Sequence, residues 1–334
     1  MINVGLLKIS NLSKLTGQTV PSISKIFKEY DEHKVTRVNK RIIGIAPNTV
    51  ESYLSNNGCS YFYRPAVILS ANLCGGVGKT TSIYNLGACM RRLSGTDTPI
   101  VYVDGDSQGS FTSIVFGEPA DDKDPILIDF LENKVKIDDI LTNLGNNIWF
   151  VKSNLNQVWI DKVISKPQTI KKAMLRFYTE IFNKLGPKTK IFQDHAPQLS
   201  SVFASSICAL HQLPMDMLRA VLIPIRSDKF AIQGADYILK EIEELQDTFT
   251  TQHKIDIHCF FSSIDRRVST TSEALKATKT KESIVQNLSS VVVRYCSEVP
   301  KSIMRCSNVY AQGKNNNAAQ DYQDLLQYVC SFKG

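Results

Sequence analysis

The chain has 334 residues, of which 43% are hydrophobic and 21% charged, and this composition excludes wholesale disorder. No run approaches the roughly 18 uncharged apolar residues of a membrane span, and the eight cysteines lack zinc-ligand spacing, so we expect a reduced, cytoplasmic protein without a structural metal. The net charge is +7, and residues 1–66 carry nine basic against four acidic side chains. Such a concentration of positive charge is typical of a polyanion-binding unit, and equally of a solvated basic surface.

Residues 1–64 are predicted to form a small, all-α, helix-turn-helix domain that binds DNA. The stretches 12–27 and 41–54 each place a glycine, Gly17 or Gly44, before a segment with apolar residues three and four apart. This pattern buries one helix face and leaves the other free for a DNA groove. One such unit is enough to read DNA, and the other could pack against the body or form a dimer arm. A helical cap without DNA contact is the competing interpretation.

Residues 65–334 are predicted to form a doubly wound α/β domain with a mainly parallel sheet. Short apolar runs without polar alternation are typical of strands that are buried on both faces. Helical patterns at 80–93 and 229–249 alternate with these runs, and β–α alternation favours a parallel sheet whose ligands bind at the carboxyl ends of the strands. The expected strands are residues 66–73, 99–104, 148–152, 190–194, 219–226, 255–262 and 290–295.

The segment CGGVGKTT at residues 74–81 follows the first of these strands and opens a helix, which is the context of a phosphate-binding loop. Glycines let backbone amides approach phosphate oxygens, and the helix N-terminus adds partial positive charge. We expect Lys79 to pair with β- and γ-phosphate oxygens, Thr80 to coordinate Mg²⁺ and Thr81 to contact the α-phosphate. The nucleotide-binding residues expected in the loop are Gly75, Gly76, Val77, Gly78, Lys79, Thr80 and Thr81.

The glycines of this loop depart from the ordinary pattern, which would place a glycine at position 73, where the chain has leucine. The arrangement resembles the deviant Walker A loop of the ParA/MinD class of ATPases. Four further blocks follow in that family's order. They are DGDSQG at 104–109, DHAP at 194–197, IPIRSDKFAIQG at 223–234, and SEVPK at 297–301 followed by QGK at 312–314. The chain therefore resembles ParA-family partition ATPases that carry an N-terminal helix-turn-helix region.

The resemblance implies roles for residues outside the loop. Asp106 would orient or deprotonate the attacking water and would thus be catalytic together with Lys79. Asp104 would support the loop or the water shell of Mg²⁺, and Asp194 would hold a Mg²⁺-bound water. Pro300 would lie near the adenine. The implied cofactors are ATP or ADP and Mg²⁺, with Thr80, Asp104 and Asp194 as the metal-site residues.

Cys74 stands where the family usually has a lysine that reaches the phosphates of the partner subunit in a dimer. A cysteine cannot supply that charge. Another Arg or Lys could fill the role, the protein could bind ATP but hydrolyse it slowly, or the residue could be an engineered substitution. We predict that Cys74→Lys raises the ATPase rate, and an unchanged rate would indicate a substitute cation.

Basic residues also recur near the C-terminus. The family binds DNA without sequence preference through C-terminal basic residues of its ATP-bound dimer, and such binding depends on salt. A solvated helix face is an equally good interpretation of any single position. The candidate DNA-binding residues are Arg266, Arg267, Lys301 and Arg305.

The resemblance implies a nucleoid-associated ATPase that moves plasmid DNA. Its ATP-bound homodimer would bind DNA, a ParB-type centromere-binding protein would stimulate hydrolysis, and the N-terminal region would repress its own operon. A nucleotide-controlled transcriptional regulator with little turnover is the main alternative. A MinD-like membrane ATPase is disfavoured, because residues 320–333 contain two acids and one lysine rather than a basic amphipathic helix.

Overall fold

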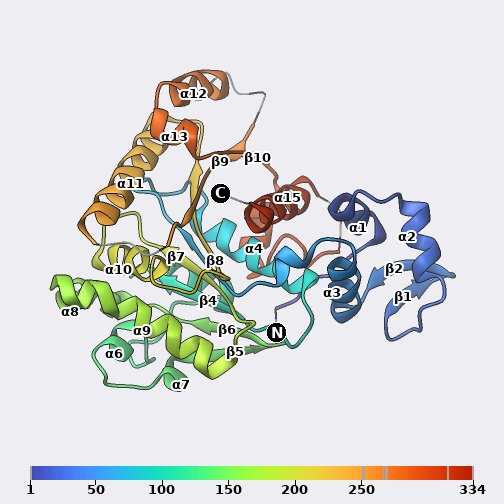
Figure 1. Ribbon diagram of the computed structural model, residues 1–334, viewed down its shortest axis with the longest axis horizontal. Helices are drawn as coiled ribbons and strands as arrows, with labels where there is room; N and C mark the ends of the chain where they lie inside the picture. The colour runs from blue at the N-terminus through green and yellow to red at the C-terminus, as the bar shows by residue number, and fades with distance from the viewer. Residues whose placement is uncertain (1, 250–252, 266, 268–269, 314–315, 333–334) are drawn as a thin grey trace.

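The computed structural model describes residues 2–249, 253–265, 267, 270–313 and 316–332. An eight-stranded sheet of order β10-β9-β8-β3-β7-β4-β6-β5 forms the body, and every neighbouring pair is parallel except β5 and β6 (Figure 1). This sheet confirms the predicted doubly wound α/β fold. Its strands are β3 (Ala66–Ser70), β4 (Ile100–Gly105), β5 (Leu141–Gly145), β6 (Ile148–Val151), β7 (Lys190–His195), β8 (Leu218–Ile225), β9 (Asp256–Ile264) and β10 (Leu288–Arg294).

Helices cover both faces of the sheet. Consecutive residues of a central strand therefore point into two different apolar cores, one on each face. On β3, Val67 and Leu69 belong to one core and Ile68 to the other. The first core is covered by α6 (Leu127–Leu131), α7 (Ile137–Ile140), α8 (Ile160–Val163), α9 (Pro167–Leu185), α10 (Ser201–Leu210), α11 (Lys229–Thr248), α12 (Thr270–Lys279) and α13 (Glu282–Gln286). The second is covered by α4 (Lys79–Leu93), α5 (Ser110–Phe116), α14 (Glu298–Met304) and α15 (Asn317–Ser331).

The N-terminal unit mixes helices with a β-hairpin. Gly17, at φ 72°, separates the first two helices, as expected for the stretch 12–27. The expectation of an all-α unit is wrong, and so is the second helix-turn-helix, because Gly44 lies within a strand that pairs with its neighbour in antiparallel fashion. The elements are α1 (Ile9–Thr16), α2 (Val20–Phe27), β1 (Val35–Val38), β2 (Arg41–Ile45), α3 (Pro47–Asn56) and the 3-10 helix η1 (Ser60–Tyr63).

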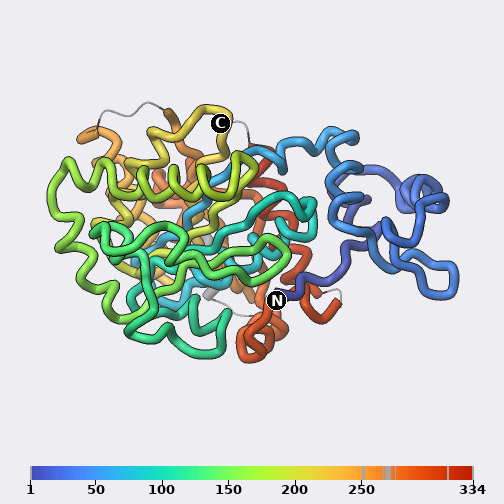
Figure 2. The backbone as a smooth tube through the Cα atoms, turned by 90° about the horizontal axis from the view of Figure 1, so that it is seen from below, coloured from blue at the N-terminus to red at the C-terminus, as the bar shows by residue number. Residues whose placement is uncertain are grey.

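The N-terminal unit projects from one end of the body but shares its apolar core (Figure 2). Buried residues of the unit, such as Leu12 and Phe62, belong to the same cluster as residues of α4 and α15. Hydrogen bonds reinforce the junction. The Gln327 amide on α15 donates to the carbonyl of Leu15 at 3.0 Å, and the hydroxyl of Tyr63 donates to the carbonyl of Leu93 at 3.1 Å. The unit is therefore packed against the face of the body that α4 and α15 form.

The structure also bears on the cysteines and on membrane spans. All eight cysteines are free thiols, consistent with a reduced protein. Among the described residues, none of the helices combines the length and apolar character needed to cross a membrane.

Candidate functional site

The glycine-rich segment forms a loop between β3 and α4, at the carboxyl ends of the parallel strands. Gly76 and Gly78 adopt left-handed backbone conformations, with φ of 69° and 97°. A Cβ atom at Gly78 would lie 2.7 Å from the hydroxyl oxygen of Ser262 on β9, whereas one at Gly75 would have no atom within 4 Å. Gly76 and Gly78 are thus required by the backbone conformation, whereas Gly75 keeps open the space that a side chain would occupy.

Asn72 anchors the start of the loop, and sequence reasoning missed it. Its side-chain amide is buried and donates to the carbonyls of Pro224 at 2.9 Å and Ala231 at 3.2 Å, while its Oδ1 accepts the backbone N–H of Cys74 at 2.9 Å. Helix α11 approaches so closely that a Cβ at Gly234 would lie 2.4 Å from Asn72 Oδ1. A polar residue directly between a buried strand and a glycine loop is the signal that could have identified it.

Lys79 begins α4 and folds back over the loop. Its Nζ donates to the carbonyl of Cys74 at 3.1 Å, and the side chain is buried. Burial lowers the pKa of Lys79, and the nearby charges of Asp194 and Asp106 oppose that effect. An amino group held by a carbonyl of the glycine loop, at the N-terminus of a helix, is suited to bind phosphate oxygens.

Two acidic residues predicted for the metal site lie side by side on neighbouring strands. Asp104 on β4 is in register with Asp194 on β7. Asp194 Oδ2 accepts the hydroxyl of Thr80 at 2.5 Å, and Asp194 Oδ1 is buried with no hydrogen-bond partner among the described residues. Burial raises the pKa of Asp194, and the charge of Asp104 adds to that shift. A buried carboxylate oxygen with nothing to bind is the feature that a hydrated cation would satisfy.

Asp104 itself holds the turn that follows β4. Its Oδ2 accepts the backbone N–H and the hydroxyl of Thr112 at 2.8 and 2.7 Å, and its Oδ1 accepts the backbone N–H of Asp106 at 3.1 Å. Burial raises the pKa of Asp104 to about 6, although these hydrogen bonds oppose the shift. Both oxygens of Asp104 are thus committed to the turn that follows β4.

Asp106 is less enclosed than its neighbours. Its Oδ1 accepts the backbone N–H of Gln108 at 2.9 Å, and its carbonyl accepts the hydroxyl of Ser153 at 2.7 Å. These contacts fix the carboxylate at the mouth of the loop. Asp106 also contributes to the electrostatic environment of Lys79, so the structure brings the two expected catalytic residues together.

The remaining predicted positions are spread over the C-terminal part. Pro300 is exposed on α14. Arg267 pairs with Asp265 at 2.6 Å, and Lys301 pairs with Glu298 at 3.2 Å. These acidic partners weaken the electrostatic attraction of Arg267 and Lys301 for a polyanion. Arg305 is exposed at the end of α14. Arg266 lies outside the described residues.

An arginine contacts the loop two residues after Cys74, the position that departs from the family pattern. The Sγ of Cys74 lies 3.5 Å from the carbonyl oxygen of Gly75. Arg226, directly after β8, donates from Nη1 to the carbonyl of Gly76 at 3.4 Å and lies 3.5 Å from Asp228. Sequence reasoning did not single out Arg226, although it lies inside the block 223–234.

The residues of the loop fit a magnesium nucleotide. The orphaned Asp194 Oδ1, the Thr80 hydroxyl beside it and the glycine cradle each meet one requirement of such a ligand. Lys79 supplies the phosphate-directed charge. These residues come from the carboxyl ends of β3, β4 and β7, where ligands of open α/β sheets bind.

Comparisons with known proteins agree with this geometry. A family model described as an AAA domain matches residues 66–257, more than half of the chain. The chromosome partitioning protein ParA of Caulobacter vibrioides is 26% identical over 214 residues, which cover 63% of this chain and 74% of that protein. The chromosome-partitioning ATPase Soj of Treponema pallidum is 25% identical over 214 residues, covering 64% and 77%.

Solved structures share the fold at low identity. The Cyanothece McdA apo structure superposes with a TM-score of 0.62 at 15% identity, covering 80% of this chain and 99% of that one. A Borrelia burgdorferi plasmid partition protein bound to AMPPNP superposes with a TM-score of 0.59 at 18% identity, covering 79% and 97%. Cobyrinic acid a,c-diamide synthase of Mycobacterium smegmatis, with an ATP analogue and magnesium, gives 0.60 at 17% identity, covering 79% and 92%.

Proposed function

The chain belongs to the ParA family of partition-type P-loop ATPases, and from this premise we propose that it hydrolyses ATP to drive DNA partition as a nucleotide-dependent homodimer. The observation that carries the proposal is the group formed by Lys79, Thr80 and Asp194. In this group a phosphate-directed amine, a hydroxyl and a buried carboxylate oxygen without a partner face one loop. ATP with Mg²⁺ supplies the phosphoryl group and a cation that neutralises charge on the phosphate oxygens.

Each residue has a defined task in this proposal. Lys79 Nζ would bind phosphate oxygens in place of the carbonyl of Cys74, and the Thr80 hydroxyl and Asp194 would hold the metal with its water. Asp106 would accept the proton of the attacking water at Oδ2, because its Oδ1 is already committed to the N–H of Gln108. Phosphoryl transfer depends mainly on positioning and charge stabilisation, so losing any of these groups should lower kcat more than it disturbs the fold.

Arg226 provides the cation that Cys74 cannot provide. Its guanidinium reaches the loop at Gly76, and its side chain is half exposed. We expect Arg226→Gln to lower the ATPase rate and Cys74→Lys in that background to restore part of it. A rate that is unaffected by Arg226→Gln but raised by Cys74→Lys alone would show that the natural chain lacks the second cation.

The N-terminal unit is the proposed DNA-binding element. Arg37 is committed to the fold, since its guanidinium donates to the carbonyls of Phe27, Lys28 and Tyr30 at the end of α2. The side chains of Lys28, Lys40 and Arg41 line an open groove between α2 and the β-hairpin. Such a groove offers phosphate contacts beside a helix of the length that enters DNA grooves. The C-terminal residues Arg266, Arg267, Lys301 and Arg305 form a second candidate contact.

DNA binding can be tested through its salt dependence. We expect Lys28→Gln combined with Arg41→Gln to reduce the slope of log K against log salt by about 2, because each neutralised phosphate contributes about 0.9. Lys171→Gln, an exposed charge on α9, is the matched control. An unchanged slope would remove the N-terminal groove from the proposal and leave the C-terminal residues to be tested.

ATP turnover with Mg²⁺, measured with and without nonspecific DNA and a ParB-type centromere-binding protein, tests the function. We expect stimulation by the two together and ATP-dependent dimers in size-exclusion chromatography. Binding without turnover would favour the nucleotide-controlled regulator, in which autorepression by the N-terminal unit is the output. Absence of affinity for adenine nucleotide with magnesium would overturn the proposal.

A further inference from the structure

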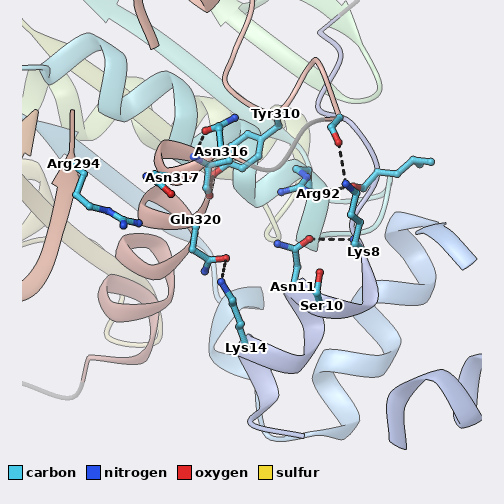
Figure 3. A pocket seen from close by; sticks show the side chains of 13 residues that line it. Lys8, Ser10, Asn11, Lys14, Arg92, Arg294, Tyr310, Asn316, Asn317 and Gln320 are labelled. Carbon is cyan, nitrogen blue, oxygen red and sulfur yellow. Dashed lines mark hydrogen bonds between the residues drawn. The ribbon is translucent and has the colours of Figure 1, made fainter. Parts of the chain in front are cut away.

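A second cavity lies at the junction between the N-terminal unit and the body, at the opposite end of α4 from the nucleotide loop. Its volume is about 290 Å³, and it is lined by residues of α1, α4, β10 and α15 together with Tyr310, Gly313 and Asn316 (Figure 3). Figure 3 shows Lys14 of α1 and Gln320 of α15 meeting beside it, with Arg92 and Tyr310 nearby. The fold thus brings residues from both ends of the chain to one pocket.

The cavity is lined by basic and neutral polar side chains, and none of the described residues that line it is acidic. Lys14 Nζ donates to the amide oxygen of Gln320 at 2.7 Å, and Lys8 Nζ donates to the carbonyl of Gly313 at 3.1 Å, so neutral acceptors position both amines. Arg294, at the margin, is paired with Asp321 at 2.6 Å. Asp324, which does not line the cavity, accepts the Gln320 amide at 2.6 Å and lies near Lys14, so acidic side chains stand behind the basic lining rather than in it.

Arg92 is the strongest evidence for a ligand. The residue is only 8% exposed, and its guanidinium lies 4.5 Å from the ring centroid of Tyr310. Its Nη2 donates to the carbonyl of Leu6 at 3.0 Å, but its Nε is buried without a hydrogen-bond partner, and no carboxylate pairs with it among the described residues. A buried, unpaired guanidinium is costly, and an anion would satisfy it.

The helices around the cavity add to this field. Ser10 and Asn11 belong to the first turn of α1, and Asn317 begins α15, so the positive ends of two helices meet at the cavity. The hydroxyl and amide side chains there can donate hydrogen bonds to oxygen acceptors. A planar guanidinium, a flexible amine and neutral donors together form the donor set that suits phosphate oxygens.

We propose that this cavity binds a phosphate-bearing anion, with Arg92 and Lys14 as its principal ligands. The volume is at the lower limit for small-molecule sites, so the cavity fits one or two phosphoryl groups better than a whole nucleotide. The phosphoryl group can come from a small phosphorylated molecule or from a DNA backbone phosphate. The inference does not depend on the proposed function, since it concerns the far end of α4.

The experiment must separate this cavity from the nucleotide loop, which also binds phosphates. Isothermal titration with pyrophosphate, at constant ionic strength, should therefore use the full chain carrying Lys79→Ala. We expect saturable binding there, weakened about tenfold by Lys14→Gln, because a charge-assisted hydrogen bond is lost. Ser10→Glu places an acid at the cavity and should abolish binding.

Matched substitutions on α2 serve as controls, because Lys25 and Ser22 are exposed and lie outside the cavity. Lys25→Gln and Ser22→Glu should leave pyrophosphate affinity unchanged. Thermal unfolding of each variant without ligand separates loss of the site from loss of the fold. Failure of pyrophosphate to bind the Lys79→Ala protein, or equal affinity in Ser10→Glu, would overturn the proposal.

A final arm identifies the source of the phosphoryl group. A short DNA duplex is added as competitor to the Lys79→Ala protein with pyrophosphate bound. Displacement by the duplex, together with weaker DNA binding by Ser10→Glu, would assign the cavity to a backbone phosphate. Retention of pyrophosphate in the presence of the duplex would assign it to a small phosphorylated ligand.

Discussion

Replacing Asp194 by asparagine should stabilise the nucleotide-free protein while removing its response to magnesium nucleotide. The substitution keeps an oxygen for the hydroxyl of Thr80, which donates at 2.5 Å. It removes the negative charge of the buried carboxylate, while the amide nitrogen in the place of Oδ1, like Oδ1 itself, has no hydrogen-bond partner among the residues described. The buried carboxylate thus lowers the stability of the nucleotide-free protein, although ligand binding requires it.

The size of the effect follows from burial. An unsatisfied buried polar group costs about 1–3 kcal/mol and a charged one costs more, so we expect removal of the charge to recover an amount of that order. Unfolding entropies near 2.1 cal/mol/K per residue give about 0.7 kcal/mol per degree for 334 residues, so Tm should rise by about 1–4 °C at pH 8. Because burial raises the pKa of Asp194, the folded state retains a proton that the unfolded state releases. The wild-type protein therefore loses stability, relative to Asp194→Asn, as the pH rises from about 4 through that raised pKa.

Differential scanning fluorimetry from pH 4 to pH 8, with and without magnesium nucleotide, measures both parts. The two proteins should have equal Tm near pH 4 and diverge as the pH rises. At a nucleotide concentration about 100 times Kd, the free energy of unfolding of the wild type should rise by about 2.7 kcal/mol, and that of Asp194→Asn should not change. Asp122→Asn, at an exposed loop position, is the control. A lower Tm for Asp194→Asn at pH 8, or a gain that does not depend on pH, would refute the reasoning.

Three further predictions concern packing around the loop and the junction. Gly234→Ala should destabilise the protein by about 1–3 kcal/mol and weaken nucleotide binding, since its Cβ would lie 2.4 Å from Asn72 Oδ1; nucleotide titration with thermal unfolding checks both. Gly75→Ala should leave Tm unchanged but weaken nucleotide binding, because its Cβ enters open space in the loop. A chain that begins at residue 65 should aggregate in size-exclusion chromatography, because the shared core would be exposed.

The sequence was informative where local rules decide the structure. Seven strands of the sheet were expected close to where they lie, because buried parallel strands are short apolar runs with few alternatives. The loop was predicted from its glycines and the lysine that follows. Asp104 and Asp194 were assigned to one metal site through the family resemblance, and the structure places them in register on neighbouring strands. Their register, and hence their mutual effect on pKa, needed the sheet order.

The N-terminal hairpin was missed because apolar spacing was given more weight than residue type. Val35, Thr36 and Val38, with Ile43 and Ile45, are β-branched residues that favour strands. Asn39 and Lys40, the two residues between the strands, have positive φ angles, as in the tight turns of β-hairpins. Isoleucines near Gly44 satisfied a helical pattern as well, and short apolar runs do not distinguish the two. The missed strand β5 lies at one edge of the sheet, and most of its residues are only partly buried.

Other features depend on contacts between distant residues, which no local pattern specifies. Arg226 meets Gly76 across 150 positions of the chain, and Arg92 meets Leu6 across 86. Each arginine has an ordinary sequence context, and its neighbours along the chain do not predict these partners. The positive cavity at the junction is therefore a property of the tertiary structure alone.

Helix α4 gives the nucleotide loop and the junction cavity a direct physical connection. Lys79 is its first residue and Arg92 lies in its last turn, about 20 Å away at 1.5 Å per residue. The helix is buried along most of its length, between the sheet and α15, and closely packed helices move as units rather than bending continuously. A ligand that displaces one end of α4 therefore displaces Arg92 relative to α1. By linkage, any change that bound nucleotide makes in the anion affinity at Arg92 is matched by an equal change that the anion makes in nucleotide affinity.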